Sequence, residues 1–149
     1  MKTLVLVSII YLFSIFSIQA QILSPVKWSY LMKKNTSNEA TIYLRATIED
    51  GWHIYSQNIK SGGPTGTIFK FKPSKMYSLS GKTTEPTPIA KYEEAFKMRV
   101  GYFVKSVTFQ QKVKFNKGLK KIEGTLEYGV CNDNQCLPPE EVQFSIPLK

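Results

Sequence analysis

Two cysteines are the residues of this chain whose type and spacing suggest chemistry. Cys131 and Cys136 are the only cysteines in the sequence, and four residues, Asn132-Asp133-Asn134-Gln135, separate them. Thiols this close can bond across a turn, and such a disulfide either braces a fold or exchanges electrons with other thiols. The spacing by itself leaves both interpretations open.

The segments on both sides of the cysteines have the alternation of half-buried strands. On the N-terminal side, four apolar residues share one parity: Ile122, Leu126, Tyr128 and Val130. On the C-terminal side, the alternating residues are Val142, Phe144, Ile146 and Leu148. The residues Asn-Asp-Asn between the cysteines favour a turn. We therefore expect two antiparallel strands with a cysteine near each end of their connection.

Residues 1–20 have the features of a secretory signal peptide. Lys2 gives a positive start, residues 4–18 are almost wholly apolar, and Ala20 is a small residue suited to cleavage. A membrane anchor is the alternative, but the apolar run is short and no basic flank follows it. We expect residues 1–20 to be removed, and residues 21–149 to form one exported domain without a membrane span.

Export also bears on what the cysteines can do. Outside the cytoplasm, two nearby thiols can form and keep a disulfide. Two cysteines and the single histidine, His53, are too few for a closed four-ligand zinc site. We expect no metal and no bound cofactor.

The chain is basic, with 20 Lys and Arg against 11 Asp and Glu and a formal net charge of +9 at pH 7. The lysines are spread along the sequence, with a denser patch over residues 112–121. There they alternate with Val113 and Phe115, as on the solvated face of a strand. Because an exported protein rarely meets nucleic acid, we expect no such partner, and the charge serves solubility or contact with acidic partners.

The rest of the chain also has the pattern of short strands, most clearly at residues 26–32, 41–48, 69–71, 76–79, 100–104 and 107–115. We expect loops at residues 61–66 and 81–88, and a bulge or bend near Lys105-Ser106, where the alternation slips. Residues 91–98 lack alternation and form at most a helical turn. Roughly eight or nine short strands and no helix predict an all-β, immunoglobulin-like antiparallel β-sandwich, with a closed barrel as the alternative.

The size of the disulfide loop bears on its role. Closing so small a ring stabilises a fold by only about 2 kcal/mol. A domain of this length should not depend on it, and the bridge closes a turn that strand pairing already closes. Cysteines at a hairpin tip are also more easily reached by a partner than cysteines in a core. These points favour a redox role without excluding a structural one.

The exported part of the chain resembles the N-terminal periplasmic domain family of the thiol:disulfide interchange protein DsbD. Three blocks carry the resemblance: Asp50-Gly51-Trp52-His53-Ile54-Tyr55, Gly62-Gly63-Pro64, and Tyr128 to Pro139, which includes Cys136-Leu137-Pro138-Pro139. The resemblance implies an immunoglobulin-like domain that passes electrons between thioredoxin-fold redox proteins. A separate membrane electron carrier is a second expected partner.

The resemblance also implies roles for particular residues. Cys136 would form the mixed disulfide with a partner, and Cys131 would resolve it. The family covers its cysteines with a cap loop that carries acidic residues and a phenylalanine, and the matching residues are Glu93, Glu94 and Phe96. Phe96 would then be a lid over the disulfide. An ordinary core aromatic is the alternative.

Three more aromatic residues, Trp52, Tyr55 and Tyr128, are candidates for lining the site by the same resemblance, although core packing explains them equally well. His53 receives no catalytic role, because its sequence context fits a packed or surface histidine. If Asp133 and the cap-loop glutamates lie close to the thiols, they raise the thiol pKa values and leave the isolated domain a reluctant nucleophile.

The hypothesis from the sequence is a periplasmic thiol–disulfide interchange protein, acting as a protein-disulfide reductase or a component of one. It would relay reducing equivalents between thioredoxin-fold partners through Cys131 and Cys136. The alternative is a secreted immunoglobulin-like binding module whose disulfide is purely structural.

Overall fold

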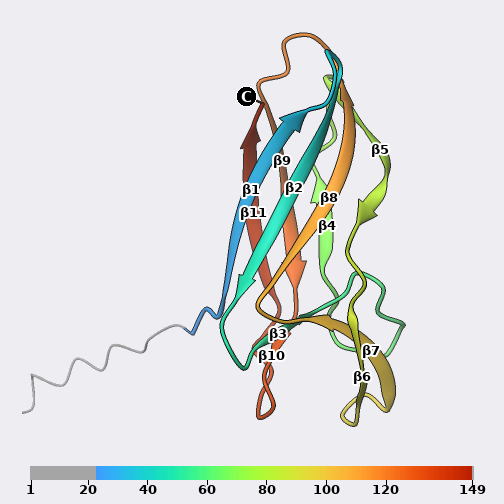
Figure 1. Ribbon diagram of the computed structural model, residues 1–149, viewed down its shortest axis with the longest axis vertical. Helices are drawn as coiled ribbons and strands as arrows, with labels where there is room; N and C mark the ends of the chain where they lie inside the picture. The colour runs from blue at the N-terminus through green and yellow to red at the C-terminus, as the bar shows by residue number, and fades with distance from the viewer. Residues whose placement is uncertain (1–22, 149) are drawn as a thin grey trace, which may run out of the picture.

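The computed structural model describes residues 23–148, and these residues form eleven β-strands and no helix (Figure 1). The predicted signal peptide, residues 1–20, lies outside the described residues. The strands in chain order are β1 Val26–Lys34, β2 Glu39–Ile48, β3 His53–Tyr55, β4 Ile68–Phe71, β5 Tyr77–Thr84, β6 Ile89–Glu93, β7 Met98–Phe103, β8 Ser106–Phe115, β9 Lys121–Tyr128, β10 Val130–Cys131 and β11 Glu140–Pro147.

Two sheets form the sandwich. One has the strand order β1-β2-β8-β5 and the other β11-β9-β4, and every pairing in both is antiparallel. Aromatic rings of the first sheet meet those of the second, with centroid distances of 6.0 Å for Trp28–Phe69 and 5.6 Å for Tyr30–Phe144. The sheets are open, so the immunoglobulin-like sandwich is confirmed and the closed-barrel alternative is wrong.

The core lies between these sheets because each long strand turns every second side chain inward. In β2, the apolar residues that alternate along the predicted strand 41–48 are all buried: Ile42, Leu44, Ala46 and Ile48. The predicted pairing around the cysteines is also confirmed, since β9 and β11 pair antiparallel with Tyr128 opposite Glu140. This pairing brings the two ends of the cysteine segment together.

A third sheet, with the strand order β10-β3-β7-β6, lies at one end of the sandwich (Figure 1). The chain leaves this sheet between β7 and β8, where Lys105 has a φ of 61°, and this confirms the predicted bend. β11 starts beside the third sheet and runs to the opposite end of the molecule, where the described chain ends (Figure 1).

The predicted loop at residues 81–88 is wrong in its first half, because β5 continues to Thr84. The register shifts between Ser80 and Thr84, and Gly81 takes a φ of 74° there. Buried Gln111 fills the irregularity: its Nε2 donates to the Gly81 carbonyl oxygen at 3.2 Å, and its Oε1 accepts from Thr83 Oγ1 at 2.8 Å. One side chain thus replaces the backbone partners that a regular ladder would supply.

Residues 91–98 also differ from the prediction. They form most of a hairpin in which β6 pairs with β7, with Glu93 opposite Met98. The turn at residues 94–97 is closed by Phe96 N donating to the Glu93 carbonyl at 3.1 Å. β6 lies at the sheet edge and buries no side chain fully, so it carries no alternation by which the sequence could reveal it.

Candidate functional site

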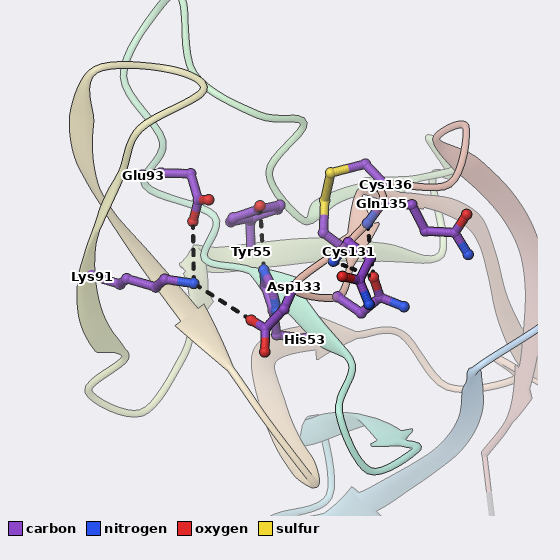
Figure 2. Close-up of a disulfide and its surroundings, with 10 residues drawn as sticks. His53, Tyr55, Lys91, Glu93, Cys131, Asp133, Gln135 and Cys136 are labelled. Carbon is purple, nitrogen blue, oxygen red and sulfur yellow. Dashed lines mark hydrogen bonds and ion pairs between the residues drawn. A yellow bond between two sulfur atoms is a disulfide. The ribbon is translucent and has the colours of Figure 1, made fainter.

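Cys131 and Cys136 are joined by a disulfide in the third sheet (Figure 2). The two cysteines differ in accessibility: Cys131 is only 4 % exposed, whereas Cys136 lies on the surface. A molecule approaching from solvent therefore meets the Cys136 side of the bond first.

The turn between the cysteines is organised by the side chain of Asn132. Its Oδ1 accepts hydrogen bonds from the backbone N–H groups of Asn134 at 2.9 Å and Gln135 at 2.8 Å. Asn132 N in turn donates to the Gln135 carbonyl at 2.9 Å. The predicted turn is thus confirmed, and its asparagine supplies the hydrogen bonds that keep the cysteines facing each other.

The buried cysteine is held by strand pairing. β10 pairs with β3, which places Cys131 opposite His53 and Val130 opposite Ile54. Gly129 connects β9 to β10 and donates its N–H to the Thr65 carbonyl oxygen at 3.2 Å. A Cβ at position 129 would lie 2.5 Å from that oxygen, so only glycine lets the two segments approach this closely.

Cys131 lies in a small hydrophobic cluster apart from the main core. Its other buried members are Tyr55 and Val100, and three half-buried side chains pack against them: Ile59, Met98 and Tyr102. The loop after β3 closes tightly over this cluster, because a Cβ on Gly63 would lie 2.7 Å from Ile59 Cγ2 and 3.0 Å from Met98 Sδ. The Gly62-Gly63-Pro64 block thus supports the shape of the site.

The same loop is anchored by Glu85, which the sequence analysis did not single out. Its carboxylate accepts from Gln57 N at 2.9 Å and Asn58 Nδ2 at 3.0 Å, and also from the Ser56 hydroxyl. Charge-assisted hydrogen bonds of this kind are stronger than neutral ones. Glu85 therefore fixes the start of the loop that covers the Cys131 cluster.

A polar pair lies next to the disulfide on β3. His53 Nε2 is 3.3 Å from the Tyr55 hydroxyl oxygen, and the two rings meet edge to face (Figure 2). Burial lowers the pKa of His53, as does the charge of Lys91, against the opposing effect of Glu93 and Asp133. Burial, with a contribution from Glu93, raises the pKa of Tyr55 to about 12. Both side chains are therefore neutral at pH 7.

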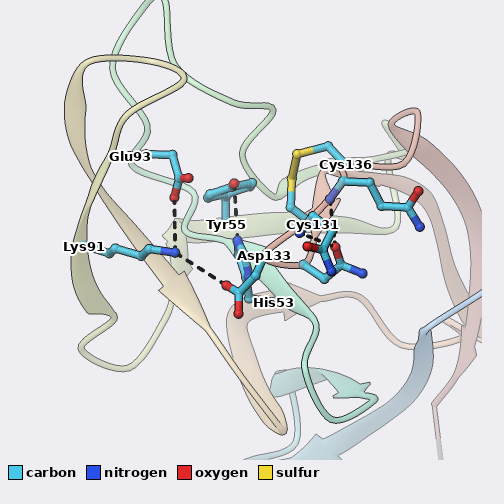
Figure 3. Close-up of polar contacts among 10 residues, drawn as sticks. His53, Tyr55, Lys91, Glu93, Cys131, Asp133 and Cys136 are labelled. Carbon is cyan, nitrogen blue, oxygen red and sulfur yellow. Dashed lines mark hydrogen bonds and ion pairs between the residues drawn. A yellow bond between two sulfur atoms is a disulfide. The ribbon is translucent and has the colours of Figure 1, made fainter.

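Three charged side chains surround this pair. Lys91 Nζ lies 3.9 Å from Glu93 Oε2 and 3.9 Å from Asp133 Oδ1 (Figure 3). Asp133 belongs to the turn between the cysteines, so the lysine links the β6–β7 hairpin to the disulfide. Neither Lys91 nor His53 was predicted to belong to the site. The pairing of β3 with β10 brings His53 opposite Cys131, and the contact with Asp133 brings Lys91 to the cysteine turn.

The structure separates the other sequence candidates. Tyr55 packs with Cys131, whereas Trp52 and Tyr128 belong to the main core. The Tyr128 hydroxyl donates to Glu140 Oε2 at 2.8 Å, which helps to hold β9 against β11. Glu94 is exposed in the hairpin turn, and Phe96 is half-buried there. Phe96 is not among the hydrophobic side chains of residues 23–148 that pack against the Cys131 cluster.

Residues 23–148 contain no group of three or more His, Cys, Asp or Glu side chains placed to hold a metal ion. In the same residues there is no helix long and apolar enough to cross a membrane.

The comparison with protein families finds one described as "Thiol:disulfide interchange protein DsbD, N-terminal", which matches residues 19–148. The match covers the disulfide, the β6–β7 hairpin and the whole of the sandwich. No curated protein matches the chain.

Solved structures with the same fold include three from bacteria. The N-terminal domain of DsbD from Neisseria meningitidis, in the reduced form, matches with a TM-score of 0.53 at 18% identity, covering 80% of this chain and 84% of that one. The complex between the DsbD and PilB N-terminal domains from the same organism matches with a TM-score of 0.55 at 17% identity, covering 84% of this chain and 87% of that one. The N-terminal periplasmic domain of ScsB from Proteus mirabilis matches with a TM-score of 0.59 at 18% identity, covering 85% of this chain and 47% of that one.

Proposed function

Because the chain belongs to the family of DsbD N-terminal domains, we propose that it is a periplasmic thiol–disulfide interchange protein whose redox centre is Cys131–Cys136. We further propose that residues 1–20 direct export and that residues 21–149 are the working domain. The periplasmic location is supported by the similar ScsB domain, which is described as periplasmic. The partners would be thioredoxin-fold redox proteins, with a separate membrane electron carrier as a further source of electrons.

The observation that carries the proposal is the unequal exposure of the two cysteine residues. Cys131 is 4 % exposed and packs beside Tyr55, whereas Cys136 is exposed on the turn. A disulfide that only braced the fold would need no accessible side. Here the accessible side is the cysteine that the family resemblance assigns to the mixed disulfide.

The exchange follows from ordinary thiol chemistry. A partner thiolate attacks the sulfur of Cys136, a new S–S bond forms between partner and Cys136, and the Cys131–Cys136 bond breaks. The electron pair of the broken bond leaves on Cys131, which becomes a thiolate and takes up a proton. The partner's second thiol then displaces Cys136, so the partner dithiol is oxidised and both cysteines of this chain are reduced. The reverse sequence passes the two electrons to the next partner.

We expect this chain and its thioredoxin-fold partner to form a complex during the exchange. The DsbD N-terminal domain of Neisseria meningitidis has been solved together with the PilB N-terminal domain, which supports docking of a second protein domain on this fold. Trp52 and Tyr128 would act from the core rather than touch such a partner. The cap-loop residues Glu93, Glu94 and Phe96 would be moved by it.

The proposal is tested with two single-cysteine variants. In Cys131→Ser, the exposed Cys136 thiol should form a stable mixed disulfide with an oxidised thioredoxin-fold protein, because no second thiol can resolve it. The matched variant Cys136→Ser keeps only the buried thiol and should trap much less. Equal trapping by both, or trapping through Cys131 alone, would contradict the assignment. No trapping in either variant would favour the binding-module alternative.

A further inference from the structure

Two carboxylates, one in the β6–β7 hairpin and one in the cysteine turn, face the same lysine. Glu93 ends β6, Asp133 lies in the turn between the cysteines, and Lys91 Nζ is 3.9 Å from an oxygen of each (Figure 3). The three side chains thus connect the hairpin to the turn. Two negative charges and one positive charge leave this group with a net negative charge, and one of its members, Asp133, lies in the turn between the cysteines.

Glu93 depends on this lysine more than a surface carboxylate would. Its Oε2 atom is buried and has no hydrogen-bond partner among residues 23–148. A buried charged oxygen without a hydrogen bond is costly unless an opposite charge faces it. Lys91 is the cation placed to supply that charge.

Asp133 connects the lysine to the sulfurs. It lies two residues from Cys131 and three from Cys136, in the turn that the Asn132 side chain orders. Its own side chain is 89% exposed, and within residues 23–148 the ion pair with Lys91 is the only contact that restrains its carboxylate. A carboxylate this near disfavours a thiolate, and a paired lysine opposes that effect.

We propose that Lys91 is a positioning residue for disulfide exchange, which holds Asp133 and Glu93 and offsets their charge where the sulfurs become negative. This proposal rests on the proposed function. When the Cys131–Cys136 bond breaks, the electron pair stays on Cys131 until a proton arrives. Without Lys91, the two carboxylates would oppose that negative charge unchecked. The ammonium group of Lys91 offsets their charge and so stabilises the thiolate.

The other titratable groups that face the Cys131 cluster do not supply this charge. They are His53 and Tyr55 on β3 and Tyr102 on β7. Burial, followed by the charge of Lys91, lowers the pKa of His53, so the imidazole is uncharged at pH 7. Lys91 is the cation that an ion pair ties to the turn carrying the two cysteines.

The test measures alkylation of Cys131 in the reduced protein by iodoacetamide as a function of pH. In Lys91→Met, the rate at pH 7 should fall about threefold and the profile should move to higher pH, since an exposed ion pair has an effect of this order. Lys91→Arg keeps the charge and should restore the wild-type profile. Lys70→Met is the matched control, because Lys70 pairs with Glu127 at 3.7 Å on the β4–β9 surface, away from the disulfide.

A second variant separates charge from structure. Asp133→Asn removes a negative charge from an exposed position and should speed alkylation, and the double variant Lys91→Met/Asp133→Asn should return close to the wild-type rate. The proposal is overturned if Lys91→Met matches Lys70→Met, or if Asp133→Asn slows the reaction as Lys91→Met does. Because alkylation needs no partner, these outcomes are independent of whether Cys131→Ser traps a mixed disulfide.

Discussion

His53 lies directly opposite Cys131 in the antiparallel pairing of β3 with β10, so both side chains point to the same face of the third sheet. This is the only histidine of the chain. It is 7% exposed and meets the rings of Tyr55 and Tyr102 edge to face. The strand that holds the buried Cys131 therefore pairs with the strand that holds the single histidine.

This relationship predicts how stability depends on pH. Burial, followed by Lys91, lowers the pKa of His53 below its ordinary value of about 6.5. At a pH between the pKa of His53 in the folded protein and its pKa in the unfolded chain, the unfolded chain binds more protons than the folded protein. The contribution of His53 to the free energy of unfolding is therefore complete above about pH 6.5 and is lost as the pH falls through the pKa of the folded protein. Urea unfolding measured between about pH 5 and 7.5 should show this loss. In His53→Gln the decrease should disappear, and an unchanged slope would contradict the assignment.

The reduction potential separates exchange from a structural bridge. Structural disulfides of exported proteins have potentials below about −300 mV, whereas accessible exchanging ones lie higher. Because Cys136 is exposed, we expect the Cys131–Cys136 bond to have a reduction potential above about −300 mV, measured by titration against glutathione or dithiothreitol. Mass spectrometry after alkylation would count the free thiols. A bond that remains oxidised below −300 mV would support the binding-module alternative.

The lid can be tested by comparing two residues of the β6–β7 hairpin. The resemblance to the DsbD family predicts that Phe96→Ala speeds reduction of the disulfide by small thiols. The structure instead packs Met98 against the cluster that contains Cys131, so Met98→Ala is the matched comparison. A faster reaction for Phe96→Ala alone would support the lid. Acceleration for Met98→Ala alone would assign the shielding to Met98.

Removal of the loop anchor should affect both stability and reactivity. Glu85→Ala deletes the acceptor for Gln57 N and Asn58 Nδ2, and each hydrogen bond contributes about 1 kcal/mol at a partly exposed site, where water can replace the lost carboxylate. We expect a decrease of about 2 kcal/mol in the free energy of unfolding and faster thiol reaction, because the loop over Cys131 loosens. Glu127→Ala removes only a surface partner of Lys70 and should change stability by less than about 0.5 kcal/mol.

The sequence predicted the parts of the fold that have a one-sided burial pattern. In β2, β9 and β11 most of the apolar residues fall on one parity, so their faces and the pairing around the cysteines followed from period-two patterning. The β6 edge strand could not be found in this way, because its side chains are exposed or only half-buried. The end of β5 was missed because a buried side chain, Gln111, replaces its regular ladder.

The site was predicted less completely than the fold. The two cysteines and Tyr55 could be named from local sequence, since their block carries the resemblance. Lys91 and Glu85 could not, because each contacts residues far away in the sequence. His53 could not, because its place opposite Cys131 depends on the pairing of β3 with β10. Lys91 meets Asp133, and Glu85 meets Gln57 and Asn58, only after the sheets have assembled.

The course of β11 has a practical consequence. This strand begins near the cysteine turn and carries the chain to the far end of the sandwich (Figure 1). A tether joined after Leu148 would therefore anchor the molecule by its far end and leave Cys136 facing the solution. Immobilised on a bead or an electrode in this way, the protein would still receive visiting domains, whereas attachment through the 94–97 turn would block their approach.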